Sequence, residues 1–148
     1  MLRRLAESQG SVRVSRLVES EPWGFGSPNS FLNVGISFDC ELEPEELLDA
    51  TQAIQRQICP DSHRDAAGNY IDRLIDIDII CGVAESQADG SCSGGKGLSL
   101  CVVDTDRLQL PHPCAFRRDF VMRPLAEIDP EMAHLLSIWF HQRQQVSE

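Results

Sequence analysis

The sequence predicts a single domain of the α+β class in which the strands pair antiparallel. Segments whose apolar residues alternate with period two are interspersed with amphipathic helical segments. The connection across residues 84–97 is polar and leaves no room for a crossover helix, which favours antiparallel pairing. Because 148 residues fit one hydrophobic core, we expect one domain over residues 1–148, with residues 84–97 as a flexible insertion.

Period-two alternation predicts the strands. It is clearest over residues 31–39, where one face would carry Leu32, Val34, Ile36 and Phe38. Further strand-like patterns occupy residues 11–19, 74–81 and 98–103. Residues 21–28 are rich in Pro and Gly and are expected to form a loop.

Two helices are predicted from their first residues. Pro44 suits a first helical position and Pro60 ends the segment, in which one stripe is formed by Leu47, Ala50, Ile54 and Ile58. In the second helix, Asp129 is the expected N-cap and Pro130 follows it. Its expected packing face consists of Met132, Leu135, Leu136 and Trp139. Residues 2–9 resemble the end of a further helix.

The charge balance argues against several classes of partner. Thirteen basic and 23 acidic residues give a net charge of −10, which repels nucleic acid and anionic membrane surfaces. The sequence shows no apolar span and no signal peptide, so we expect a cytoplasmic protein. The six cysteines form no C-x-x-C pair and are expected to be reduced and mostly packed as small hydrophobes.

Two aspartates in an isoleucine-rich run are the strongest chemical signal. In an extended segment, Asp76 and Asp78 point to the same face, about 6.5 Å apart along the chain. Their mutual repulsion is about 2.5 kcal/mol at an effective dielectric of 20. A divalent cation would reverse the sign, and magnesium commonly binds one or two carboxylates together with substrate phosphates. The alternative is a solvated strand face with incidental acids.

Basic residues flank this acidic pair in an otherwise acidic chain. They are Arg73, Arg107, His112, Arg117 and Arg118. Carboxylates that hold magnesium and cations that bind phosphate oxygens together suit a magnesium–polyphosphate ligand. The alternative is that the arginines pair with nearby surface acids. His112 lies between Pro111 and Pro113, so its backbone is expected to be stiff.

A glycine-rich stretch over residues 90–97 imitates a phosphate-binding loop. It fits G-x-x-x-x-G-K, but Gly97 stands where that loop needs a Ser or Thr hydroxyl. The residues before it are polar and those after it are strand-like, whereas the loop requires a strand and then a helix. We therefore expect a surface insertion here and regard an unrelated nucleotidase as the weakest of the functional hypotheses.

Several short motifs occur in the order typical of one enzyme family. They are Glu21-Pro22-Trp23-Gly24, Phe31-Leu32-Asn33, Thr51-Gln52-Ala53-Ile54, Asp72-Arg73-Leu74-Ile75-Asp76-Ile77-Asp78-Ile79 and Leu110-Pro111-His112-Pro113. With them, the chain resembles the 6-hydroxymethyl-7,8-dihydropterin pyrophosphokinase family over about residues 12–135. The segment from Asp119-Phe120-Val121 to Pro124-Leu125 continues the resemblance.

The resemblance implies a ferredoxin-like antiparallel sheet with helices packed on it. It also implies transfer of pyrophosphate from ATP to 6-hydroxymethyl-7,8-dihydropterin in folate biosynthesis, giving AMP and the pterin diphosphate. Two magnesium ions (Mg2+) are implied, with Asp76 and Asp78 as their ligands. By the same resemblance, these two residues together with Arg73 and His112 form the expected catalytic set.

The resemblance also assigns the binding residues. ATP is expected to contact Gln52, Arg73, Ile79, Arg107, His112 and Arg118. The pterin is expected to contact Ser20, Glu21, Trp23, Phe31, Asn33, Tyr70, Asp76 and Phe120. Asn33 matches the amide that binds the pterin edge, Phe120 matches a stacking ring, and Tyr70 stands where many members have a lid tryptophan.

Three departures from the family pattern set the alternatives. The chain starts inside the family's first helix, which implies a missing strand and either truncation or repair by self-association. Cys59-Pro60 replaces the usual Gly-Arg after the second helix, with Arg64 as the nearby substitute, and residues 84–97 exceed the usual hairpin. The leading hypothesis is an active pyrophosphokinase acting on small molecules; the alternative is a catalytically weakened pterin-binding or interaction protein.

Overall fold

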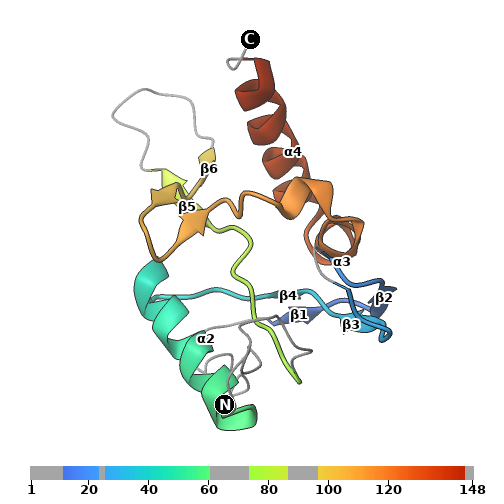
Figure 1. The fold of residues 1–148 in the computed structure, drawn as a ribbon. Coiled ribbons are helices and arrows are strands. Elements are labelled where there is room, and N and C mark those ends of the chain that lie inside the picture. Colours follow the sequence, from blue (N-terminus) through green and yellow to red (C-terminus); the bar gives the residue numbers. More distant parts are fainter. Residues whose placement is uncertain (1–11, 24–25, 61–73, 87–96, 146–148) are drawn as a thin grey trace, which may run out of the picture. The chain divides into compact units, whose positions relative to one another are not determined.

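The computed structural model describes residues 12–23, 26–60, 74–86 and 97–145 (Figure 1). It divides into two compact units, Met1–Asp78 and Ile79–Glu148. Each unit combines helix with short antiparallel strand pairs, so the predicted α+β class is confirmed. The single-domain organisation stays a prediction. The helix end predicted over residues 2–9 lies outside the described residues.

The first unit contains a two-part antiparallel ribbon. Its strands are β1 (Arg13–Val14), β2 (Val18–Ser20), β3 (Phe31–Asn33) and β4 (Ile36–Ser37). β1 pairs with β4, and β2 pairs with β3 (Figure 1). The strands predicted over residues 11–19 and 31–39 are thus both present, but each is divided in two.

Ser15 and Gly35 explain where the ribbon divides. The Ser15 amide donates to the Gly35 carbonyl at 2.9 Å, and the Gly35 amide donates to Ser15 Oγ at 2.8 Å. A side-chain hydroxyl therefore accepts from a backbone amide, which interrupts the regular ladder while leaving the amide satisfied. Ser15 is buried, with 8% of its surface exposed.

The alternation predicted for residues 31–39 is observed over residues 31–37, but the apolar face is the open one, and Phe38 is half-buried instead. Leu32 is 70% exposed and Ile36 is 42% exposed, whereas Phe31 and Asn33 on the other face are half-buried. Val14, opposite Ile36 in the ladder, is 59% exposed. The pattern therefore predicted the two faces of the ribbon but not which of them is covered.

The first predicted helix is confirmed as α2 (Pro44–Ile58). The Glu46 carboxylate accepts from the Glu43 amide at 3.0 Å, which satisfies one backbone donor at the helix start. Ile54 is buried in agreement with the predicted stripe, and Thr51 is buried beside it. Ile58 is 49% exposed, contrary to the prediction, because the last residue of the helix lies beyond this packed region.

The strand predicted over residues 74–81 is wrong as a strand, although the segment shows the expected alternation. Ile75, Ile77 and Ile79 are half-buried, and the intervening aspartates are exposed. A strand needs a neighbouring backbone as well as an alternating sequence. Among the described residues, the backbone bond made to this segment is the one from the His112 amide to the Ile80 carbonyl, at 2.7 Å.

The second unit begins with two hairpins. They pair β5 (Val83–Ser86) with β6 (Gly97–Leu100) and β7 (Val103–Asp104) with β8 (Gln109–Leu110). The antiparallel pairing predicted around residues 84–97 is confirmed. Residues 84–86 and 97, at the two ends of the predicted insertion, belong to the β5–β6 ladder, and residues 87–96 lie outside the described part. The flexible insertion stays a prediction. A strand follows the glycine-rich stretch, as expected.

Helices complete the second unit. They are η1 (Ala115–Arg117), α3 (Asp119–Ile128) and α4 (Pro130–Gln145) (Figure 1). Asp129 Oδ1 accepts from the Met132 amide at 3.0 Å, which confirms the predicted N-cap of α4. The helices contact one another, and their buried side chains include Ala115, Ile128, Ala133 and Leu136.

Cysteine usage agrees in part with expectation. The five described cysteines are free thiols, but Cys40 is exposed rather than packed, and Cys92 lies outside the described residues. Within the described ranges, no helix combines the length and apolarity that a bilayer crossing requires.

Candidate functional site

Two carboxylates lie exposed on one face of an extended segment. Asp76 and Asp78 alternate with less exposed isoleucines, so both side chains face the same side of the chain. Gln55, from the last turns of α2, donates its Nε2–H to Asp76 Oδ1 at 3.3 Å. The helix therefore helps to orient one carboxylate of the pair, a contact that the sequence analysis did not anticipate.

This pair fits a hard divalent cation. Carboxylate oxygens are the ligands that magnesium prefers, and an exposed face leaves coordination positions for water and phosphate. Among the described residues, no group of three His, Cys, Asp or Glu side chains is arranged to hold a metal. Two protein carboxylates with the remaining ligands from substrate and water is the usual arrangement for magnesium on nucleotides.

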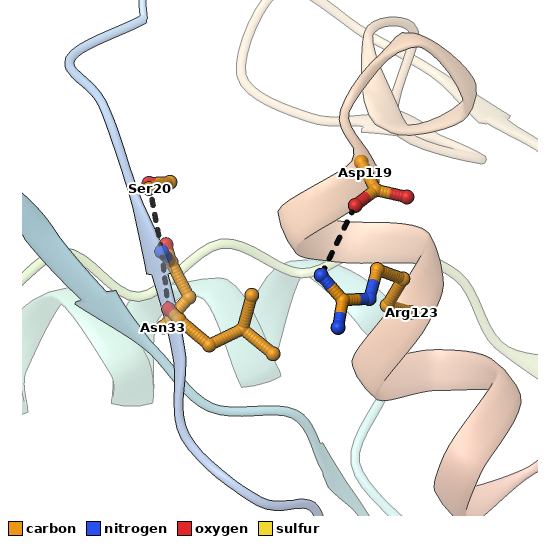
Figure 2. Close-up of polar contacts among 5 residues, drawn as sticks. Ser20, Asn33, Asp119 and Arg123 are labelled. Atoms are coloured by element: carbon orange, nitrogen blue, oxygen red, sulfur yellow. Dashed lines mark hydrogen bonds and ion pairs between the residues drawn. The ribbon is translucent and has the colours of Figure 1, made fainter.

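The β2–β3 pair presents an amide on its half-buried face. Asn33 Nδ2 donates to Ser20 Oγ at 2.9 Å and to the Val18 carbonyl at 3.0 Å (Figure 2). A third acceptor, the Phe31 carbonyl, lies at 3.4 Å. The register of the ladder places Ser20 opposite Phe31 and Val18 opposite Asn33, so these side chains share one face. The structure thus brings together three residues that the resemblance assigned to pterin binding.

The remaining predicted residues of the first unit lie on α2 and on the loop after β2. Glu21 is exposed and Trp23 is 48% exposed. Gln52 is half-buried on α2. Arg73 and Tyr70 lie outside the described residues.

His112 is held firmly in the second unit, as its two flanking prolines predicted. Its amide donates to the Ile80 carbonyl, and its carbonyl accepts from the Ala115 amide at 3.0 Å. Its ring Nδ1 accepts from the Cys114 amide at 3.2 Å. An amide can only donate, so Nδ1 lacks a proton in this arrangement and the neutral ring carries its proton on Nε2. Nε2–H is then a fixed donor for an anionic oxygen.

Arg118 and Phe120 lie together at the start of α3. The Arg118 guanidinium carbon is 5.9 Å from the centre of the Phe120 ring. Both side chains are half-buried, and Arg118 Nε is buried without a hydrogen-bond acceptor among the described residues. Arg107 is exposed near the β7–β8 turn. Two cations and the His112 donor in this unit suit phosphate oxygens.

Two further features bear on what this unit can do. Burial raises the pKa of the Cys81 thiol to about 11, and the nearby Asp129 charge adds to the effect. This thiol therefore stays neutral near pH 7 and is no nucleophile.

The Asp119–Arg123 pair on α3 spans 3.4 Å but is largely exposed, so it contributes little stability (Figure 2).

Comparison with known proteins decides the family. A family model described as 7,8-dihydro-6-hydroxymethylpterin-pyrophosphokinase (HPPK) matches residues 1–130. The chain belongs to this HPPK family. The recognition and the enzyme class predicted from the sequence are thereby confirmed.

Several curated relatives carry the name 2-amino-4-hydroxy-6-hydroxymethyldihydropteridine pyrophosphokinase. The one from Porphyromonas gingivalis is 38% identical over 119 residues, covering 80% of this chain and 70% of the relative. The Aquifex aeolicus protein is 29% identical over 133 residues, which cover 90% of this chain and 71% of that relative's length. The Bacillus subtilis protein is 30% identical over 117 residues, which cover 79% of this chain and 58% of that relative's length. Membership of HPPK thus rests on similarity along most of the chain.

Two contacts that orient predicted residues, one in each unit, were not predicted from the sequence. Gln55 lies one helical turn beyond the predicted Gln52, and this spacing on α2 was the available signal. The Cys114 amide, which orients the His112 ring, had no side-chain signal at all because it is a backbone donor.

Proposed function

We propose that this chain transfers the β,γ-pyrophosphoryl group of ATP to the hydroxymethyl group of 6-hydroxymethyl-7,8-dihydropterin, in folate biosynthesis. The hydroxymethyl oxygen gives its proton to solvent and forms a bond to the β-phosphorus, the bond from the β-phosphorus to the α,β-bridging oxygen breaks, and AMP leaves with that oxygen. The observation that carries the proposal is the HPPK match over residues 1–130, within which two exposed carboxylates share one face.

Asp76 and Asp78 are the proposed magnesium ligands, and we propose two ions with ATP as co-substrate. When bound, magnesium neutralises phosphate charge and lowers the pKa of the attacking hydroxyl, so no protein base is needed. The protein itself contributes by orienting the carboxylates that would hold the ions. Gln55 fixes one oxygen of Asp76, and the exposed face leaves room for the phosphate chain.

The ATP-binding set consists of groups that suit polyphosphate. His112 offers Nε2–H, because its Nδ1 is occupied by the Cys114 amide. Arg107 and Arg118 supply cationic donors, which bind phosphate oxygens more strongly than neutral donors do. Arg73 completes the basic set, and Gln52 and Ile79 are proposed to contact the base.

The pterin-binding set combines an amide with aromatic rings. Asn33 and Phe31 share the half-buried face of the β2–β3 pair, and Trp23 is exposed on the loop that follows β2. Phe120 provides a further ring for stacking on a flat heterocycle. Ser20, Glu21, Tyr70 and Asp76 complete the proposed set.

The finer architectural expectations belong to the same proposal. We propose a ferredoxin-like sheet within a single domain, supported by the mixed α+β elements and the antiparallel pairing. A cytoplasmic location follows from the same function. Self-association stays a prediction.

Label transfer tests this function directly. The chain is incubated with magnesium, the hydroxymethyl pterin and ATP labelled at the β-phosphate, and the products are separated by chromatography. We expect the label in the pterin product and unlabelled AMP in equal amounts. Release of labelled phosphate or pyrophosphate without a pterin product contradicts the proposal. Pterin binding without any AMP, even at high magnesium, indicates instead the weakened pterin-binding protein.

A further inference from the structure

The side-chain amide of Asn33 has one favoured orientation in its surroundings. Two of the acceptors around Nδ2 are backbone carbonyls, those of Val18 and Phe31, and carbonyl oxygens cannot donate. A flipped amide would place its own oxygen against them. The chemistry of the neighbours therefore assigns the NH2 group to the inward position and Oδ1 to the outward one.

Both hydrogens of this NH2 group are already used. The two short bonds go to Ser20 Oγ at 2.9 Å and to the Val18 carbonyl at 3.0 Å, while the Phe31 carbonyl at 3.4 Å is a longer third acceptor. An amide nitrogen has two hydrogens, so no donor remains for a ligand. Among the described residues, none donates to Oδ1.

We infer that the Ser20 hydroxyl is a positioning group that holds the Asn33 amide so that Asn33 offers its ligand an acceptor only. Asn33 then selects a ligand edge that presents an N–H donor, as the amino-substituted ring of a pterin does. This inference rests on the proposed function for the identity of the ligand. The orientation of the amide, however, follows from the contacts of β2 and β3 alone.

Ser20 is the contact of this set that a substitution can remove. The other two acceptors are backbone carbonyls, which no side-chain change deletes. Without the hydroxyl, one amide hydrogen loses its short bond and the side chain gains freedom to turn, which lowers the fraction of the productive orientation. The loss affects ligand affinity rather than the chemical step.

The test compares four variants with the wild-type chain. Ser20→Ala removes the hydroxyl and Ser20→Thr keeps it, whereas Asn33→Ala and the double variant Ser20→Ala/Asn33→Ala complete a mutant cycle. Ser30→Ala is the matched control, because the Ser30 hydroxyl lies in the same hairpin but bonds to Glu19. Pterin affinity is measured by equilibrium binding, and the KM for the pterin, the KM for ATP and kcat are measured separately.

We expect Ser20→Ala to weaken pterin affinity and raise the KM for the pterin by roughly five- to tenfold. The KM for ATP should change less than about twofold, Ser20→Thr should keep a lower KM for the pterin than Ser20→Ala does, and the control Ser30→Ala should resemble the wild type. In the Asn33→Ala background, Ser20→Ala should have no further effect. An equal effect in both backgrounds, or a Ser20→Thr variant as weak as Ser20→Ala, overturns the inference.

Side-chain amide NMR separates this inference from the proposed function. The Asn33 NH2 signals, assigned by their loss in Asn33→Ala, should show slow hydrogen exchange in the wild type and faster exchange in Ser20→Ala. Unchanged exchange overturns the positioning role even in an active enzyme. If instead the wild type makes no AMP while the exchange and binding pattern holds, the proposed reaction fails and the positioning role stands.

Discussion

Gln55 Nε2 donates to Asp76 Oδ1 across 3.3 Å, linking the last turns of α2 to the acidic segment. The bond joins residues 21 positions apart in the sequence. It orients one of the two carboxylates proposed to hold magnesium, and a preoriented ligand binds a cation at lower entropic cost.

Gln55→Ala is expected to raise the magnesium concentration needed for half-maximal AMP formation by about threefold, because the contact is exposed and long for a hydrogen bond. The maximal rate at saturating magnesium should change little. Gln57→Ala on the exposed face of the same helix is the control and should leave the magnesium dependence unchanged. A Gln55→Ala variant with the wild-type magnesium dependence contradicts the orienting role.

His112→Ala is expected to raise the KM for ATP by roughly tenfold, since hydrogen bonds to charged groups contribute about 1.5–3 kcal/mol. The structure holds Nε2–H as the donor through the bond from the Cys114 amide to Nδ1. Steady-state kinetics with varied ATP provides the measurement. His134→Ala, an exposed histidine on α4, should behave like the wild type. Equal kinetics in the two variants would argue against a phosphate contact for His112.

Ser15→Ala is expected to lower the free energy of unfolding by about 1–3 kcal/mol, because it leaves the Gly35 amide without its acceptor in a buried position. Urea denaturation followed by circular dichroism measures the effect. Ser30→Ala removes an exposed hydroxyl from the same ribbon and should cost less than about 0.5 kcal/mol. Equal stabilities of the two variants rule out the structural role of the Ser15 hydroxyl.

Ionisation of the Cys81 thiol makes the free energy of unfolding depend on pH at alkaline pH. Its pKa is raised from 9.0 to about 11, chiefly by burial. The unfolded chain therefore releases this proton at lower pH than the folded chain does. The corresponding stability is fully present below about pH 9 and is lost as the pH rises through about 11, by about 3 kcal/mol in total.

Urea denaturation at pH 8 and pH 10.5 tests this dependence, with Cys81→Ala compared with the wild type. The wild type should lose more stability between these pH values than Cys81→Ala does. Cys40→Ala, which changes an exposed thiol, should lose as much as the wild type. If Cys81→Ala and the wild type lose the same amount, the buried thiol is not the titrating group.

Local signals explain which elements could be predicted. Pro44 and the Asp129–Pro130 pair mark helix starts through their own backbone and capping preferences, so α2 and α4 were predicted at their first residues. α3 was not predicted because Pro124 lies inside it and removes a helical donor. Its apolar spacing, with Pro124 and Ile128 buried, was the signal that could have revealed it.

Features that depend on contacts between distant parts of the chain could not be predicted from the sequence. Alternation correctly predicted that Asp76 and Asp78 are exposed on one face, because that depends only on an extended backbone. It could not predict whether residues 74–81 have a strand partner, because pairing depends on distant backbone. For the same reason, the Gln55 contact could not be predicted from sequence. The Cys114 contact is local, two residues from His112, but its donor is a backbone amide and left no side-chain signal.

Magnesium-dependent AMP formation by Asp76→Asn and Asp78→Asn tests the central claim most directly. Each change keeps the side-chain shape but removes the charge, so we expect the rate to fall roughly 100-fold or more in both variants, with unchanged circular dichroism. Asp39→Asn, an exposed acid elsewhere in the same unit, should retain the wild-type rate. Wild-type rates of AMP formation in both Asp76→Asn and Asp78→Asn would contradict the account.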